Sequence, residues 1–151
     1  MSSILATPQL QSAINTEVAD YTADKSLIHA IRFTVFVQEQ NIPLELEIDN
    51  YDPVSHHVLA FYGNVPVGTG RLAPSGKIGR VAVVRPWRRK GVGLQLMRRL
   101  FEVAKQNYHD EVVLSAQRHA IKFYEKLGFQ SEGDEFLEVG IAHVTMRKQI
   151  S

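Results

Sequence analysis

Arg88-Arg89-Lys90-Gly91-Val92-Gly93 lies between a stretch that predicts a strand, residues 78–84, and one that predicts a helix, residues 94–106. The two glycines, in the order G-x-G, allow a tight turn and let the backbone come close to a ligand. The helix that follows directs its unpaired N–H groups and its positive dipole end at this turn. With three cations beside them, these groups favour phosphate. A glycine-rich turn can also serve packing alone, so the hexapeptide by itself leaves both interpretations open.

Two common nucleotide-binding motifs do not fit this turn. The dinucleotide fingerprint G-x-G-x-x-G needs a third glycine where Gln95-Leu96 stands. The Walker motif needs Lys-Ser or Lys-Thr after a glycine, and neither glycine here is followed by such a pair. The phosphate carrier must therefore be identified from the rest of the chain.

Size and composition narrow the classes of protein. The chain has 151 residues, 44% of them hydrophobic, which predicts one globular domain over residues 1–151. The net charge of +1 argues against a general nucleic-acid or membrane-surface binder. The chain has no cysteine, which excludes disulfides, thiolate metal ligands and a cysteine nucleophile. With no signal pattern and no membrane-spanning apolar run, we expect a cytoplasmic protein.

Hydrophobic periodicity predicts an α/β fold, a mixed sheet with helices on its faces. Thr22 or Asp24 is expected to cap the first helix, and Gly128 to stop the last one. Residues 112–115 are expected to be buried on both sides. The predicted order is strand 12–19, helix to about 38, acidic loop 41–53, strands 54–62, 65–72 and 78–84, helix 94–106, strand 112–115, helix 120–127, and strands 129–139 and 141–147.

Two blocks in register resemble a known family. The first is Gly79-Arg80-Val81-Ala82-Val83 followed by Arg88-x-x-Gly91-x-Gly93, and the second is Phe123-Tyr124-Glu125-Lys126-Leu127-Gly128-Phe129. Together they resemble the GCN5-related N-acetyltransferase (GNAT) superfamily. Arg32-x-x-x-Phe36-Val37-x-Glu39-Gln40 and Gly140-Ile141-x-His143 look like a bacterial small-molecule acetyltransferase subgroup. The N-terminal pattern is also similar to that of acyl-homoserine-lactone synthases, which share the fold.

This resemblance implies the acyl-CoA N-acyltransferase fold, with a mixed central sheet of about six to seven strands, and acetyl-CoA as co-substrate. The pantetheine arm would pair with the backbone of Ala82, Val83 and Val84. The pyrophosphate would lie on the amides of Arg88, Arg89, Lys90, Gly91, Val92, Gly93 and Leu94. The implied reaction moves an acetyl group to the amine of a small molecule. A homodimer is also in keeping with the family.

The resemblance places a general acid at Tyr124, the tyrosine of the second block. A phenol with an ordinary pKa of about 10 stays protonated at neutral pH and can donate to the departing CoA thiolate. With no cysteine and no nucleophile-elbow motif, direct attack of the amine within a ternary complex is the expected route.

The general base is a more open question. Many family members use a glutamate in the strand before the turn, yet residues 78–84 contain no acid. His143 is the best substitute, because imidazole titrates near pH 6.5 and related members carry a histidine on the last strand. The alternatives are water relayed from the acidic loop, or one of the side chains Glu39, Glu47, Asp49 and His56.

Candidate acceptor-binding residues are Arg32, Glu39 and Arg80. A cation inside an apolar segment is costly unless it is paired. Each arginine therefore either contacts an anionic acceptor or pairs with an acid such as Asp49. The acidic loop over residues 45–52 favours a cationic acceptor instead. We expect no metal, since the adjacent His56 and His57 point to opposite faces of a strand.

Two further functions compete with the acetyltransferase. One is a non-catalytic acyl-CoA sensor, suggested by the missing strand glutamate. The other is a nucleic-acid binder that uses Arg85, Arg88, Arg89 and Lys90. That cluster is compact and the rest of the chain is balanced in charge, so we expect no nucleic-acid partner.

Overall fold

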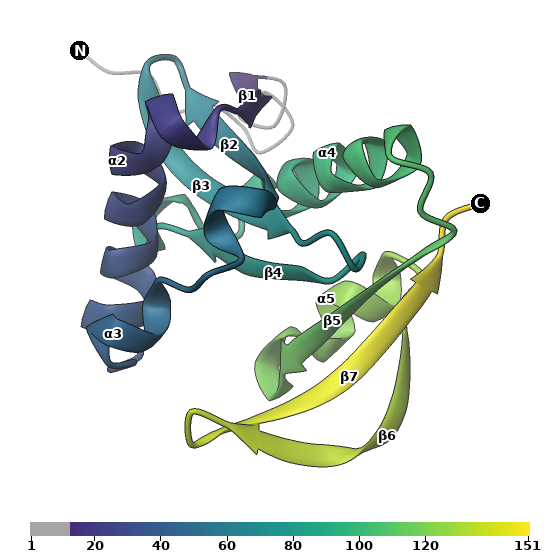
Figure 1. Cartoon of the computed structure of the whole chain (residues 1–151). Helices are drawn as coiled ribbons and strands as arrows, with labels where there is room; N and C mark the ends of the chain where they lie inside the picture. The colour runs from purple at the N-terminus through teal and green to yellow at the C-terminus, as the bar shows by residue number, and fades with distance from the viewer. Residues whose placement is uncertain (1–12) are drawn as a thin grey trace.

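The computed structural model describes residues 13–151 (Figure 1). The helices are α2 (Tyr21–Arg32), a π-helical continuation (Phe33–Glu39), α3 (Leu44–Glu47), α4 (Val92–Gln106) and α5 (Ile121–Lys126), with short 3₁₀ turns at Asp52–Val54, Arg85–Trp87 and Arg118–Ala120. The strands are β1 (Ile14–Ala19), β2 (His56–Tyr62), β3 (Val65–Leu72), β4 (Ile78–Val83), β5 (Glu111–Gln117), β6 (Gln130–Glu138) and β7 (Ile141–Gln149).

The strands form two antiparallel sheets. One has four strands in the order β1-β2-β3-β4, and the other has three in the order β5-β7-β6. Their edge strands, β4 and β5, meet in parallel at an isolated bridge between Lys77 and Val113, where the Val113 N–H donates to the Gly76 carbonyl at 3.2 Å. The predicted strands are therefore present, but the expected single mixed sheet is divided where β4 and β5 part (Figure 1).

Helices α2 and α4 cover opposite faces of the four-stranded sheet (Figure 1). On β2, Val58 and Ala60 belong to the core beneath α4, whereas the intervening Leu59 packs with α2. The core beneath α4 also contains residues of β5 and β7, so α4 packs against both sheets. Within residues 13–151, no helix has both the length and the apolar content needed to span a bilayer.

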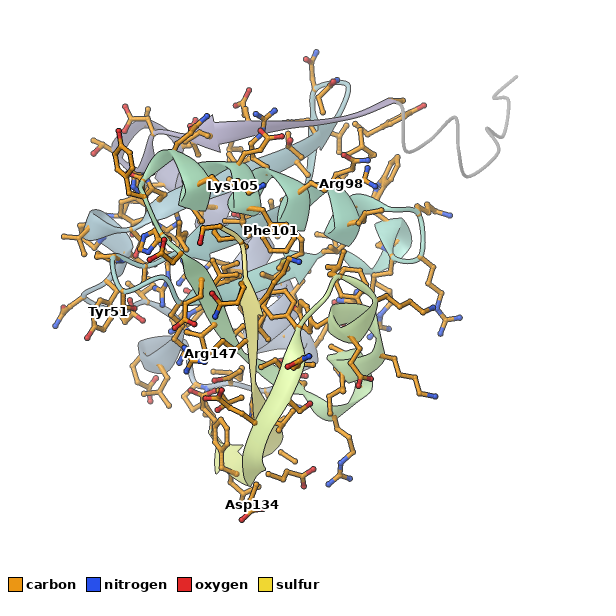
Figure 2. All side chains as sticks on the ribbon, turned by 90° about the vertical axis from the view of Figure 1, so that its right-hand side faces the viewer. Tyr51, Arg98, Phe101, Lys105, Asp134 and Arg147 are labelled. Carbon is orange, nitrogen blue, oxygen red and sulfur yellow. The ribbon has the colours of Figure 1, made fainter. Side chains whose placement is uncertain are left out.

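Two glycines of β3 allow α4 to lie this close. A Cβ atom on Gly68 would come within 2.9 Å of the Leu96 side chain, and one on Gly70 equally near to Leu100. Figure 2 shows Arg98 and Lys105 on the exposed side of the same helix, and both are solvent-exposed. At these two positions of β3, the apolar face of the helix thus packs directly against backbone.

The N-terminal elements correct the expected cap of the first helix and otherwise follow the prediction. Asp20, rather than Thr22 or Asp24, caps α2, because its carboxylate accepts from the Thr22 N–H at 3.0 Å. The helix then continues as a π-helix to Glu39. The acidic loop contains one helical turn, α3.

The later elements bring another correction. Strand β5 is longer than expected and alternates buried Val112, Leu114 and Ala116 with partly exposed residues, so it is not buried on both faces. Only one of its faces meets the core. Gly128, with a φ of 97°, follows α5 as predicted.

Candidate active site

The N-terminus of α4 presents unpaired amides. The helix begins at Val92 after Gly91, whose φ of 87° is left-handed and which provides no side-chain cap. The first amide with a helical partner is that of Gln95, which donates to the Gly91 carbonyl at 3.1 Å. The N–H groups before it lack intrahelical acceptors, and the first turn contains no acid. This geometry suits an anion.

The cations of the turn are not equivalent. Arg88 forms a two-pronged ion pair with Glu39, with both N–O distances at 2.9 Å, and its Nε donates to the Val83 carbonyl at 2.9 Å. The hydrogen bond from Arg88 lowers the pKa of Glu39 below its usual range. Arg89 is exposed and has a left-handed φ of 61°.

Strand β4 carries a bulge next to this turn. Thr69 pairs with Ala82 and Arg71 with Gly79, so two residues, Arg80 and Val81, face one residue of β3. The Val84 N–H donates to Val67 at 3.1 Å, and the Val83 carbonyl accepts from Arg88. Beyond the Lys77–Val113 bridge, β4 pairs with no strand on its outer edge within the described part of the chain.

A cavity of about 800 Å³ lies where β4 and β5 part. Of the residues predicted from the sequence, Tyr124, His143, Arg80 and the alternative bases Glu47 and Asp49 line it, whereas Arg32 and Glu39 do not. The residues predicted to bind CoA, 82–84 and 88–94, lie outside its lining. Its wall is made by residues of the π-helix and the loop after it, the end of β3 and the β3–β4 turn, β4, β5, the 3₁₀ turn before α5, α5 itself and the β6–β7 hairpin: Phe36, Gln40, Ile42, Leu46, Glu47, Asp49, Tyr51, Arg71, Ala73, Pro74, Ser75, Lys77, Ile78, Gly79, Arg80, Val81, Leu114, Ser115, Gln117, His119, Ala120, Tyr124, Glu138, Val139, Ile141 and His143.

Tyr124 reaches the cavity from α5. Its ring meets Phe123 and Phe129 edge to face, with centroids 5.1 and 5.7 Å apart. Burial raises the pKa of its phenol to about 12. The group therefore keeps its proton across the physiological range and can act as a donor.

His143 reaches the cavity from β7, and only 8% of its surface is exposed. Its Nδ1 lies 2.7 Å from the Ile141 carbonyl, which can only accept, so Nδ1 carries the hydrogen. In the neutral ring Nε2 then holds the free lone pair. The Glu138 carboxylate lies 3.7 Å from Nε2 and can pair with an imidazolium. The ring also stacks on Phe136.

The sequence analysis missed Glu138. It stands immediately before the two-residue turn Val139-Gly140 and pairs across the hairpin with Ile141. A two-residue hairpin turn between strands is readable from sequence. Pairing the two strands outward from this turn would have placed Glu138 close to His143 in the folded hairpin.

Arg32 is a structural residue in this geometry. It is completely buried, and its guanidinium donates to the carboxylates of Glu47 and Asp52 and to the Glu47 carbonyl. These donors are directed at acids and not at the cavity. Of the two roles expected for Arg32, pairing with an acid is therefore the one observed, and binding the acceptor is not. Burial alone would raise the pKa of Asp52, but hydrogen bonds and charge from Arg32, with Arg71, hold it far below its usual range.

Arg71 and Arg80 continue this cluster to the cavity wall. Arg71 reaches Asp49 at 2.7 Å and Asp52 at 2.8 Å, and Arg80 reaches Asp49 at 3.1 Å. Glu47 and Asp49, two of the alternative bases, are therefore held by arginines. His56, a third, is exposed and does not line the cavity.

Glu39 was predicted both as an alternative base and as an acceptor ligand. Its contacts with Arg88 and Arg85 instead place it beside the turn at the start of α4. The next residue, Gln40, accepts from Gln117 at 3.0 Å, at the end of β5. These two neighbours thus link the π-helix to both sides of the opening between β4 and β5.

Residues 13–151 contain no cluster of three or more His, Cys, Asp or Glu side chains placed to hold a metal ion. His56 is exposed and its neighbour His57 is buried, as alternation along a strand requires. His57 uses Nε2 to contact the Asp52 carbonyl at 2.8 Å.

Comparison with known proteins identifies the chain as an acetyltransferase-family protein. Residues 17–150 match the acetyltransferase (GNAT) domain family, to which the chain belongs. It is similar to YjcF, an uncharacterised N-acetyltransferase of Bacillus subtilis strain 168, with 38% identity over 122 residues that cover 78% of this chain and 87% of YjcF.

Solved structures agree with this family. The crystal structure of Escherichia coli ElaA has a TM-score of 0.81 and 29% identity, covering 90% of this chain and 99% of ElaA. An acyl-CoA N-acyltransferase from Pseudomonas aeruginosa has a TM-score of 0.79 and 30% identity, covering 89% and 99%. The fold predicted from the paired sequence blocks is confirmed.

Proposed function

We propose that this acyltransferase moves an acetyl group from acetyl-CoA to the amine of a small molecule. The main observation in support is that Tyr124 and His143, from separate elements, line one cavity. The unpaired amides at the start of α4 suit the diphosphate of CoA, and the outer edge of β4 suits its amide-bearing arm.

In the proposed reaction, Nε2 of His143 takes a proton from the acceptor ammonium or from the attacking amine. The amine nitrogen bonds to the thioester carbon, and the tetrahedral intermediate then loses the CoA thiolate as the C–S bond breaks. Tyr124 donates a hydrogen bond or proton to that sulfur. Glu138, beside Nε2, stabilises the imidazolium.

The competing sensor function was suggested because residues 78–84 contain no acid that could act as the general base. The pairing of His143 with Glu138 supports a base from β7 instead, so catalysis is the better-supported proposal. A sensor would bind CoA without turning over any amine.

The test is release of free CoA from acetyl-CoA in the presence of a panel of primary amines. Tyr124→Phe should lower kcat by about 10²-fold while leaving CoA affinity unchanged. Tyr108→Phe is the matched control, since Tyr108 is 93% exposed and outside the cavity. Undiminished turnover in Tyr124→Phe would remove the role of the phenol, and CoA binding without any turnover would favour the sensor.

A further inference from the structure

We infer that the acceptor carries an aliphatic or aromatic group that binds at an apolar rim of the cavity, formed by Leu46, Tyr51 and Val139. This inference rests on the proposed function and narrows its substrate class to apolar primary amines. Two features from separate elements that line the cavity support it.

The first feature is the loop that follows the π-helix. Leu46 is 51% exposed and Tyr51 is 60% exposed, and both line the cavity. Figure 2 shows Tyr51 at the periphery of the molecule. Apolar side chains in this position remain in contact with water unless a ligand covers them.

Hydrogen bonds hold this loop in place. Arg80 donates to the carbonyls of Glu47 at 3.1 Å and Leu46 at 3.3 Å. The Tyr51 N–H donates to the Asp49 carboxylate at 3.0 Å, which also pairs with Arg80. The loop is therefore built to present Leu46 and Tyr51 in one arrangement, and such preorganisation favours a ligand that covers them.

The second feature is the turn of the β6–β7 hairpin. Val139 and Gly140 have φ values of 52° and 75°, the two-positive pattern of a type I′ turn, whose first position favours Asn, Asp or Gly. A β-branched residue with this φ is strained. Val139 is 47% exposed and lines the cavity. The turn therefore carries an apolar side chain at a position whose backbone conformation disfavours it.

The charges around the cavity point the same way. Arg71 and Arg80 are paired with Asp49, and Glu47 is paired with Arg32. These groups hold one another, so the acidic loop offers little unpaired negative charge to recognise a polycation. Of the other charged side chains that line the cavity, Glu138 lies beside His143 and Lys77 is a cation that disfavours a polycation. The apolar rim is then left to select among amines.

The experiment measures acetyl-CoA-dependent CoA release with n-alkylamines of increasing length, 2-phenylethylamine, ethanolamine and spermidine. We expect kcat/KM to rise by about threefold per methylene, somewhat less than full burial would give. We expect 2-phenylethylamine to exceed ethanolamine and spermidine by tenfold or more.

Val139→Asn separates a binding role from a structural one. Asparagine suits the turn, so the melting temperature should stay the same or rise. The KM for 2-phenylethylamine should rise about fivefold, with kcat and the KM for acetyl-CoA unchanged. Tyr108→Asn is the control, since Tyr108 also has a left-handed φ, 63°, but lies outside the cavity. Its KM values should match those of the wild type.

Three results would overturn the inference while CoA release still supported the acetyltransferase. These are a kcat/KM that stays constant along the alkylamine series, a preference for spermidine, or an unchanged KM in Val139→Asn. A wild-type dimer that Val139→Asn converts to a monomer, without a change in KM, would also overturn it and assign the rim to a second copy. Failure to release CoA with any amine would end both proposals.

Discussion

Two charged stretches of this protein use their charges in different ways. In the loop over residues 45–52, the carboxylates of Glu47, Asp49 and Asp52 are all bound by arginines. At the start of α4, by contrast, several backbone amides have no helical acceptor and the first turn has no acid. When distant segments supply ion-pair partners, a charged stretch of sequence stabilises a loop. When they do not, the stretch stays free to bind a ligand.

This contrast assigns different consequences to the two regions. Charges that are buried and paired within the protein act on its stability, because breaking a buried pair leaves the partner uncompensated. Unpaired amides and exposed cations act on affinity for an anion instead. Mutations can test this division directly.

The largest expected effect comes from Arg32→Met, which removes the centre of the buried cluster and leaves Glu47 and Asp52 without their main partner. The free energy of unfolding should fall by about 3–5 kcal/mol in urea titration. Arg118→Met is the control: its pair with Glu135 is exposed and screened by water, so the loss should be much smaller than for Arg32→Met. Equal stability of the two variants would refute the structural role of Arg32.

Acid should act on the same cluster. Arg32 and Arg71 hold the pKa of Asp52 below its unfolded value, so its stabilisation is present above that value and is lost as the pH falls. Between pH 6 and pH 2 we expect this group to contribute a loss on the order of 2 kcal/mol, because one carboxyl can take up only one proton below its unfolded pKa. Asp52→Asn should be less stable than wild type at pH 7, and the difference should narrow with falling pH.

Chemical unfolding at a series of pH values provides this measurement. A constant gap between wild type and Asp52→Asn across the whole range would contradict the assignment.

A smaller effect is expected at the turn. Replacing Arg89 and Lys90 together by glutamine should weaken CoA binding by about fivefold, or roughly 1 kcal/mol, because exposed cations are screened by water and salt. Calorimetry at low salt should show the difference, and 0.5 M NaCl should shrink it. The melting temperature should not change.

Arg98→Gln is the control for this pair of substitutions, since Arg98 lies on the exposed side of α4 (Figure 2). If it weakens CoA binding as much as the double variant does, the attraction is a general effect of net charge and does not belong to the turn.

Local features of the site were predictable from sequence. The G-x-G turn, the three-strand meander and the helix that carries Tyr124 each depend on neighbouring residues, and each lies close to its predicted place. The paired sequence blocks also predicted the family correctly.

Features that depend on distant partners were not predictable in the same way. The carboxylates of Glu47 and Asp52 lie 15 and 20 residues from Arg32, and Glu39 lies 49 residues from Arg88. Sequence alone could not choose between these partners and an acceptor. The division of the sheet likewise follows from how β4 and β5 separate after a single bridge, which no local pattern encodes.

We propose that the diphosphate of CoA binds to the free amides at the N-terminus of α4. A crystal structure of the complex with CoA would locate the diphosphate. We expect its oxygens within about 2.7–3.2 Å of backbone N–H groups among residues 88–94. Diphosphate bound elsewhere, for example against the arginines that hold the loop over residues 45–52, or CoA that does not bind at all, would contradict it.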